Sequence, residues 1–166
     1  MAIPPRSRIP DATYFTTSST DGKKRLLQSD RMALLFIDVL LNYREQQKFL
    51  LHEFVVMPHH FHLLLTPSVG VTLERSLQLI KGGFSFRANK EFRTRAPVWQ
   101  TSFHDRRVRD GIEYQNLRNY IHQNPVTAGL CVAATDFPFG SASGRFPLDE
   151  IPQRLKPASR AADTQG

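Results

Sequence analysis

The chain has 166 residues, of which 40% are hydrophobic, and this is enough for about one domain with its own apolar core. Its single cysteine, Cys131, excludes an internal disulfide and favours a reducing compartment. Residues 1–11 contain three prolines and no long apolar run, so we expect no signal peptide, no membrane span and a cytoplasmic protein.

The positive charge of the chain is concentrated in one segment. Lysine and arginine outnumber the acidic residues 22 to 15, which gives a net charge of +7. Residues 75–109 hold nine basic residues against two acidic ones, so this segment alone also carries +7. Its interleaved aromatic residues are Phe84, Phe86, Phe92, Trp99 and Phe103. Such a segment suits a polyanion whose bases can stack, although scattered basic residues usually form only a solvated face.

The first third of the chain predicts a strand, a helix and a second strand. Residues 12–19 are rich in β-branched and aromatic types and precede a turn at residues 21–22. Ser29 or Asp30 can cap a helix whose apolar residues recur at helical spacing. A strand of roughly residues 48–57 follows.

The next strand carries the most informative pattern, His60-Phe61-His62. The short Pro58-His59 connection predicts an antiparallel hairpin, with His59 as a turn residue that points away from this pair. Since side chains alternate along a strand, His60 and His62 share one face and Phe61 takes the other. Two imidazoles on one face could hold a metal ion, although histidines on half-buried strands are often merely hydrogen-bonded.

Two further elements complete the predicted sheet. Residues 73 to about 90 have the apolar spacing of a helix, with Gly82-Gly83 as a weak spot inside it. Residues 98–108 indicate a fourth strand, in which Trp99 is expected to be a core residue. The order of elements predicts an α+β fold, a ferredoxin-like (split βαβ) sandwich with a four-stranded antiparallel sheet.

An additional helix follows the sheet. Asp110 can cap it, Glu113 stands where a capping box needs it, and Pro125 is expected to end it. Tyr120 and Asn124 are four residues apart, so they share the side of the helix that faces the rest of the protein.

We expect the domain to span residues 1–145. From about residue 146 to 166 the chain is rich in proline and small polar residues, and this composition predicts a disordered C-terminal tail.

Several motifs, taken together and in this order, resemble a known family. They are Val55 to Leu65, Ile80-Lys81-Gly82-Gly83, Trp99-Gln100, Arg109-Asp110 and Tyr120 to Leu130. This set resembles the single-tyrosine HUH transposases (IS200-like), and most of all their REP-associated branch, small bacterial proteins linked to repetitive extragenic palindromes. The resemblance covers residues 13–143.

The resemblance implies a site built from two distant segments. It implies that Tyr120 is the nucleophile and that His60, His62 and Asn124 bind a divalent metal, Mg²⁺ or Mn²⁺. Gln123 is a competing third ligand, because position i+3 also faces the side of Tyr120.

The implied activity is metal-dependent cleavage and strand transfer of single-stranded DNA at hairpin or palindromic DNA. The nucleophile would become joined to the 5′ phosphate as a phosphotyrosine and leave a free 3′ hydroxyl. The implied partner is single-stranded or hairpin DNA. The family includes monomers and dimers, so a homodimer is one of the two allowed states.

Basic residues in the middle of the chain are candidates for contacts with DNA phosphates. They are Lys81, Arg87, Arg106, Arg107 and Arg109. His104 and Asp105 could orient a metal ligand or contact DNA, and a plain surface role is about as plausible.

Two other functions fit parts of the sequence. A catalytically silent, domesticated protein could bind DNA hairpins without cutting them. A zinc-dependent hydrolase could use the histidine pair, but the chain offers no carboxylate base in a recognisable motif.

Overall fold

A computed structural model describes residues 11–157. Its main elements are β1 (Tyr14–Ser19), α1 (Asp30–Glu45), β2 (Phe49–Met57), β3 (His60–Pro67), α2 (Leu73–Phe92), β4 (His104–Arg107) and α3 (Gly111–Thr127). The strands form one sheet in the order β2-β3-β1-β4, with antiparallel neighbours throughout. The predicted ferredoxin-like α+β sandwich with an additional helix is confirmed. None of the helices within residues 11–157 is long and apolar enough to cross a membrane.

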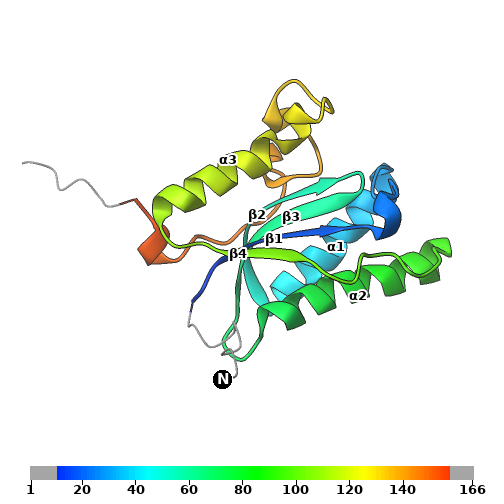
Figure 1. The fold of residues 1–166 in the computed structure, drawn as a ribbon, viewed down its shortest axis with the longest axis horizontal. Helices are drawn as coiled ribbons and strands as arrows, with labels where there is room; N and C mark the ends of the chain where they lie inside the picture. The colour runs from blue at the N-terminus through cyan, green and yellow to red at the C-terminus, as the bar shows by residue number, and fades with distance from the viewer. Residues whose placement is uncertain (1–10, 158–166) are drawn as a thin grey trace, which may run out of the picture.

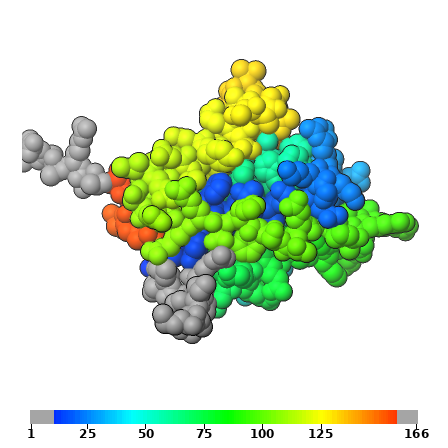
Figure 2. Space-filling model, viewed as in Figure 1, coloured from blue at the N-terminus to red at the C-terminus, as the bar shows by residue number. Residues whose placement is uncertain are grey.

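Both faces of the sheet are covered, but unequally (Figure 1). Helices α1 and α2 lie on one face over a large core, in which the rings of Phe36, Phe84 and Trp99 pack against one another. Helix α3 lies on the other face over a smaller apolar cluster that includes Leu64 and Ile121. In Figure 2 a strip of β1 is visible between α3 and the segment that carries β4. The α3 face is therefore partly open to solvent.

Strand β3 lies between β2 and β1 and is buried on both faces. Phe61, Leu63 and Leu65 point into the large core, as the alternation predicts. His62 therefore lies on the α3 face, where it is paired in register with Thr17 of β1. A shift of one residue would place the histidines in the apolar core, so the register of β3 is strongly specified.

A β-bulge in β2 turns two polar residues toward α3. Leu51 pairs with Leu65 and Glu53 with Leu64, so His52 is an extra residue in the ladder. The ring of His52 contacts that of Tyr114 on α3, and the Glu53 carboxylate accepts hydrogen bonds from α3 as well.

The fourth strand is shorter than the predicted residues 98–108, because the chain before it turns inward. Trp99 is buried, which confirms its predicted place in the core, and its Nε1 donates a hydrogen bond to the Lys81 carbonyl of α2 at 2.9 Å. Only an isolated bridge to Thr20 joins this segment to the sheet. Regular pairing with β1 begins at His104.

Helix α3 starts as predicted but does not end at Pro125. The Asp110 side chain accepts a hydrogen bond from the Glu113 amide at 2.8 Å, so the predicted cap is confirmed. Pro125 lies inside the helix, which continues to Thr127. The ring of Pro125 is buried and lies near Phe137 and Gly140, and Gly129, with φ of 75°, follows the last turn.

The prediction of a disordered tail is wrong for residues 146–157. Asp149 forms a bidentate ion pair with Arg44, at 2.9 and 3.0 Å, and accepts a hydrogen bond from the Leu51 amide of β2. The ring of Phe146 packs 5.4 Å from that of Phe54. The segment thereby covers the open edge of β2, where unpaired backbone groups would otherwise be exposed. Residues 158–166 lie outside the described residues.

The adjacent glycines of α2 should respond to alanine in opposite ways. A Cβ on Gly83 would lie 2.9 Å from Tyr43 Cε2 and 3.0 Å from Val39 Cγ1, whereas a Cβ on Gly82 would meet nothing within 4 Å. We expect Gly82→Ala to raise the free energy of unfolding by about 0.5–1 kcal/mol through helix propensity. Gly83→Ala should lower it by about 1 kcal/mol because α1 must move away. Urea denaturation measures both, and equal stabilities of the two variants would contradict this packing.

Candidate active site

The two histidines of β3 lie side by side on the α3 face. The ring centroids of His60 and His62 are 4.8 Å apart. His62 is held from two sides, because its Nδ1 lies 2.7 Å from the Thr17 hydroxyl and its ring stacks on Phe15 at 5.4 Å. Both supporting residues come from β1, so strand pairing orients the imidazole.

Both imidazoles are neutral at physiological pH. Burial, with a smaller contribution from the neighbouring His60, lowers the pKa of His62 to about 3. Burial likewise lowers the pKa of His60 to about 4, and the charges of His59 and Lys23 act in the same direction. Neutral imidazoles keep the lone pairs that a metal ion requires.

One ring nitrogen fits a metal ligand particularly well. His62 Nε2 is buried and has no hydrogen-bond partner among the described residues. When Nδ1 carries the proton and donates it to Thr17 Oγ1, Nε2 directs a lone pair into the site. An orphaned buried nitrogen is costly unless it binds something, so the donor set fits a cation.

Tyr120 reaches the histidine pair from α3. Its ring lies edge-on to His62, with centroids 5.3 Å apart, and 6.0 Å from Phe15. Its side chain is still 52% exposed, so a large substrate can reach the hydroxyl from solvent. The site therefore places an accessible phenol beside two potential metal ligands.

Asn124 is better placed than Gln123 to complete this set. It lies one helical turn after Tyr120, and its side chain is close enough to His60 to act against the lowering of that imidazole's pKa. Gln123 is exposed to solvent, whereas Asn124 is half-buried. The helix continues through Asn124 and Pro125, so Asn124 keeps helical geometry.

The prediction that His59 points away from the pair is wrong. His59 does lie in the turn, but its ring centroid is 4.7 Å from that of His60, and the two Nδ1 atoms are 3.1 Å apart. The tight turn brings the neighbouring rings together, so His59 lies at the margin of the site.

The donors present favour a metal ion that accepts oxygen as well as nitrogen ligands. Within residues 11–157 there is no group of three or more histidine, cysteine, aspartate or glutamate side chains that could hold a metal. A third protein ligand would therefore be the Asn124 amide oxygen. Two imidazoles and an amide suit Mn²⁺ or Mg²⁺ with open positions better than a closed zinc site.

Of the candidate DNA contacts on β4, Arg106 lies on the face of the site. It pairs in register with Phe15 and forms an ion pair with Glu113 at 2.6 Å while remaining 66% exposed. Arg107 is exposed and pairs with Tyr14, so its side chain points to the opposite face. Arg109 is exposed just before α3.

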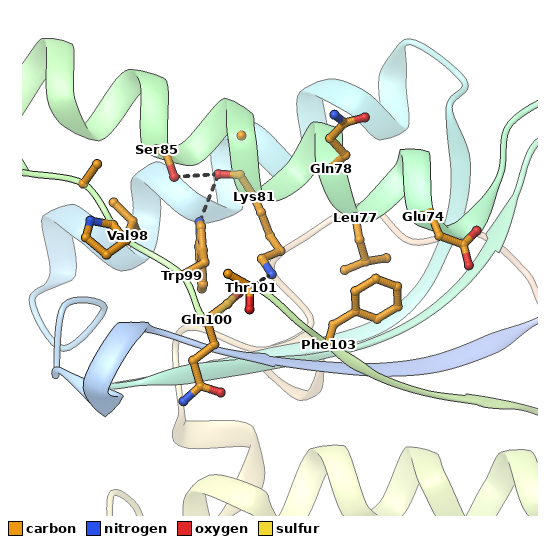
Figure 3. A pocket seen from close by; sticks show the side chains of 13 residues that line it. Glu74, Leu77, Gln78, Lys81, Ser85, Val98, Trp99, Gln100, Thr101 and Phe103 are labelled. Carbon is orange, nitrogen blue, oxygen red and sulfur yellow. Dashed lines mark hydrogen bonds between the residues drawn. The ribbon is translucent and has the colours of Figure 1, made fainter.

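The candidate DNA contacts on α2 lie in the helical layer on the opposite face of the sheet. Arg87 pairs with Asp38 of α1 and with Glu91, away from Tyr120. The Lys81 ammonium donates to the Gln100 carbonyl at 3.0 Å and lines a groove of about 480 Å³ between α2 and residues 96–103 (Figure 3). Burial lowers the pKa of Lys81. The Gln100 side chain points out of this groove, toward the side of α3.

Three residues of the site region were not singled out from the sequence. Thr17 could not be matched with His62 without knowing the strand register. Lys23, whose charge acts on His60, lies in a short 3₁₀ turn outside the basic segment. Glu53 did carry a signal, because it is the one acid in an otherwise apolar part of β2.

Comparisons with known proteins identify the family and the fold. Residues 11–124 match the model of the family described as "Transposase IS200 like". The chain is 24% identical over 142 residues to the REP-associated tyrosine transposase of Escherichia coli (strain K12), and the match covers 82% of each chain. Its fold is similar to that of a REP-associated tyrosine transposase bound to a REP hairpin, with a TM-score of 0.70, 23% identity and 96% of each chain covered.

The support that Thr17 gives to His62 can be tested through metal affinity. Thr17→Val removes the partner of Nδ1, so we expect the affinity for Mn²⁺, measured by calorimetry, to fall by about 10-fold or more. Thr16→Val is the matched control, because Thr16 Oγ1 lies on the other face and has no partner within the described residues. Equal affinities of the two variants would contradict the assigned role.

Proposed function

The chain belongs to the IS200-like transposase family, and on this premise we propose that it cleaves and rejoins single-stranded DNA beside a hairpin, with Tyr120 as nucleophile. The observation that carries the proposal is the meeting of Tyr120 and Asn124 with His60 and His62, which come from elements about sixty residues apart.

In the proposed reaction the Tyr120 hydroxyl oxygen attacks the scissile phosphorus. The phenol loses its proton, a new bond joins the oxygen to the 5′ phosphate, and the 3′ oxygen leaves and gains a proton. Attack by a 3′ hydroxyl on the phosphotyrosine reverses these steps and joins a strand. Because the phosphodiester energy is kept in the covalent link, the proposal requires no nucleotide cofactor.

The side chains around Tyr120 have distinct proposed roles. Phe15 and His62 hold the phenol ring edge-on and restrict its position. His60, His62 and Asn124 would hold the divalent ion, Mg²⁺ or Mn²⁺. When bound there, the ion would polarise the phosphate and offset the charge that develops on it.

The proposed substrate is DNA with a hairpin next to the cleavage site. A related protein of the same fold has been solved bound to a REP hairpin. The net charge of +7 favours a polyanion in this chain, and Arg106 lies on the same face as Tyr120. The half-exposed phenol suits a long polymer better than a small enclosed substrate.

The nucleophile is tested by removing one oxygen. Tyr120→Phe should abolish the covalent protein–DNA band that forms with a palindromic hairpin substrate and Mn²⁺, because the ring remains but the attacking atom is lost. Hairpin affinity should stay within about threefold, since phosphate contacts supply most of the binding. Tyr43→Phe is the control, because Tyr43 lies on α1 behind the sheet.

Adduct formation by Tyr120→Phe would contradict the assignment. Tight, salt-sensitive hairpin binding by the wild-type chain without any adduct would favour the catalytically silent binding protein instead.

The face that binds DNA can be identified with two arginines. We expect Arg106→Gln to weaken hairpin binding about 3- to 10-fold and to reduce the salt dependence by about one phosphate contact. Arg87→Gln should change neither, because Arg87 pairs with acidic residues on the helical layer. Fluorescence anisotropy over a range of salt concentrations measures both. A larger effect at Arg87 would place the DNA on the opposite face.

A further inference from the structure

We propose that Glu53 is a positioning residue for the reaction, and that it fixes the rotation of α3 and thereby the places of Tyr120 and Asn124. The inference rests on the proposed function of these two residues. It concerns a buried cluster of side chains on the far flank of the helix, which makes no contact with the histidine pair in the described structure.

Glu53 is the centre of a hydrogen-bond network between β2, α3 and the segment after α3. Its carboxylate accepts from Arg118 Nε at 2.9 Å and from His122 Nε2 at 2.9 Å, both on α3. It also accepts a short hydrogen bond from the Ser141 hydroxyl. The Ser141 oxygen in turn accepts from the Phe54 amide at 3.0 Å. Three separate parts of the chain are thus joined through one carboxylate.

The carboxylate of Glu53 is charged although it is buried. Only 9% of its side chain is exposed. Burial raises the pKa of Glu53, but the hydrogen bonds from His122, Ser141 and Arg118 outweigh it and hold the pKa below its usual value. An ionised, fully hydrogen-bonded carboxylate tolerates little displacement of its donors, so the network is rigid.

The spacing along α3 places the network opposite the reacting groups. Each residue advances a helix by about 100°, so residues two apart lie on opposite flanks. Arg118 and His122 form one flank, Tyr120 and Asn124 form the other, and buried Ile121 faces the sheet between them. A hold on the first flank sets the rotation of the helix and therefore the direction of the second.

Apolar packing alone gives α3 only a limited hold on the sheet. Its buried residues are Tyr114, Ile121 and Pro125, and the cluster beneath it is the smaller of the two cores. A narrow apolar stripe permits a helix to roll, whereas directional hydrogen bonds do not.

The order of groups in the network excludes a second catalytic centre of the serine type. In such a triad the histidine lies between the serine and the carboxylate. Here the carboxylate lies between Ser141 and His122, so the imidazole does not contact the hydroxyl as it must in a triad. The arrangement is one of support.

The test compares Glu53→Gln with Glu150→Gln in the full-length chain. Both changes remove one charge and no volume, but Glu150 is 88% exposed and pairs only with Lys156 in the described structure. We expect Glu53→Gln to slow adduct formation on a hairpin substrate by about 100-fold, because small misplacements of reacting groups cost about this much. Hairpin affinity should stay within about threefold, and Glu150→Gln should behave as wild type.

Metal affinity separates positioning from a loss of stability. Glu53→Gln should lower the affinity for Mn²⁺ about 10-fold, because Asn124 is no longer held against His60. In an Asn124→Ala background the same change should have no further effect. Additive losses in the double variant would overturn the proposal, as would wild-type cleavage by folded Glu53→Gln.

Hydrogen exchange tests the placement of α3 without any reaction. Amides of residues 117–127 should exchange faster in Glu53→Gln while those of β3 are unchanged, whether or not the wild-type chain cleaves DNA. If the wild type forms no adduct but this pattern appears, the proposed function fails and the hold on α3 stands. Unchanged exchange of the α3 amides in Glu53→Gln would overturn the proposal that Glu53 positions this helix. If Glu53→Gln does not fold, Arg118→Met is the second variant, because it removes one donor to Glu53 from a partly exposed position. It should raise the exchange rates of the same amides by a smaller amount.

Discussion

Strand β3 fixes the positions of the other elements and of the site, because it lies inside the sheet and both of its faces are buried. Phe61, Leu63 and Leu65 fill the core under α1 and α2, and this fixes the register of the strand. Once that register is set, alternation leaves His60 and His62 on the other face. The histidine pair is thus held in place by the core residues that alternate with it along β3, and the site needs only an element that covers this face and carries a nucleophile.

Helix α3 is that cover, and it is held by unlike interactions on its two sides. Toward the sheet it buries few apolar side chains, each worth about 1.5–3 kcal/mol. Toward β2 it donates to Glu53, where removal of one partner of a buried pair typically costs about 3–5 kcal/mol. The ion pair between Arg118 and Glu53 contributes less, about 1 kcal/mol, because 41% of the Arg118 side chain is exposed. For a helix with so little apolar contact, these hydrogen bonds supply a large share of the free energy that keeps α3 on the sheet.

Local patterns predicted the elements well and selected side chains that the fold brings together, and long-range partners account for the differences. The alternation at His60 and His62 and the cap at Asp110 depend on neighbours in sequence. The inward turn at Trp99 depends on its hydrogen bond to the Lys81 carbonyl. The ordered tail depends on the ion pair in which Arg44 donates to Asp149. Likewise, the role inferred for Glu53 needs a bulge at His52 that no composition or spacing indicates.

We propose that β3 and α3 of one chain build a single metal-dependent cleavage site. Anomalous diffraction from crystals of this protein grown with Mn²⁺ tests it most directly. We expect one peak within about 2.0–2.5 Å of His62 Nε2, an imidazole nitrogen of His60 and the Asn124 amide oxygen, on the side of Tyr120. A peak bound through Gln123, or Mn²⁺ only at sites away from the histidine pair, would contradict it.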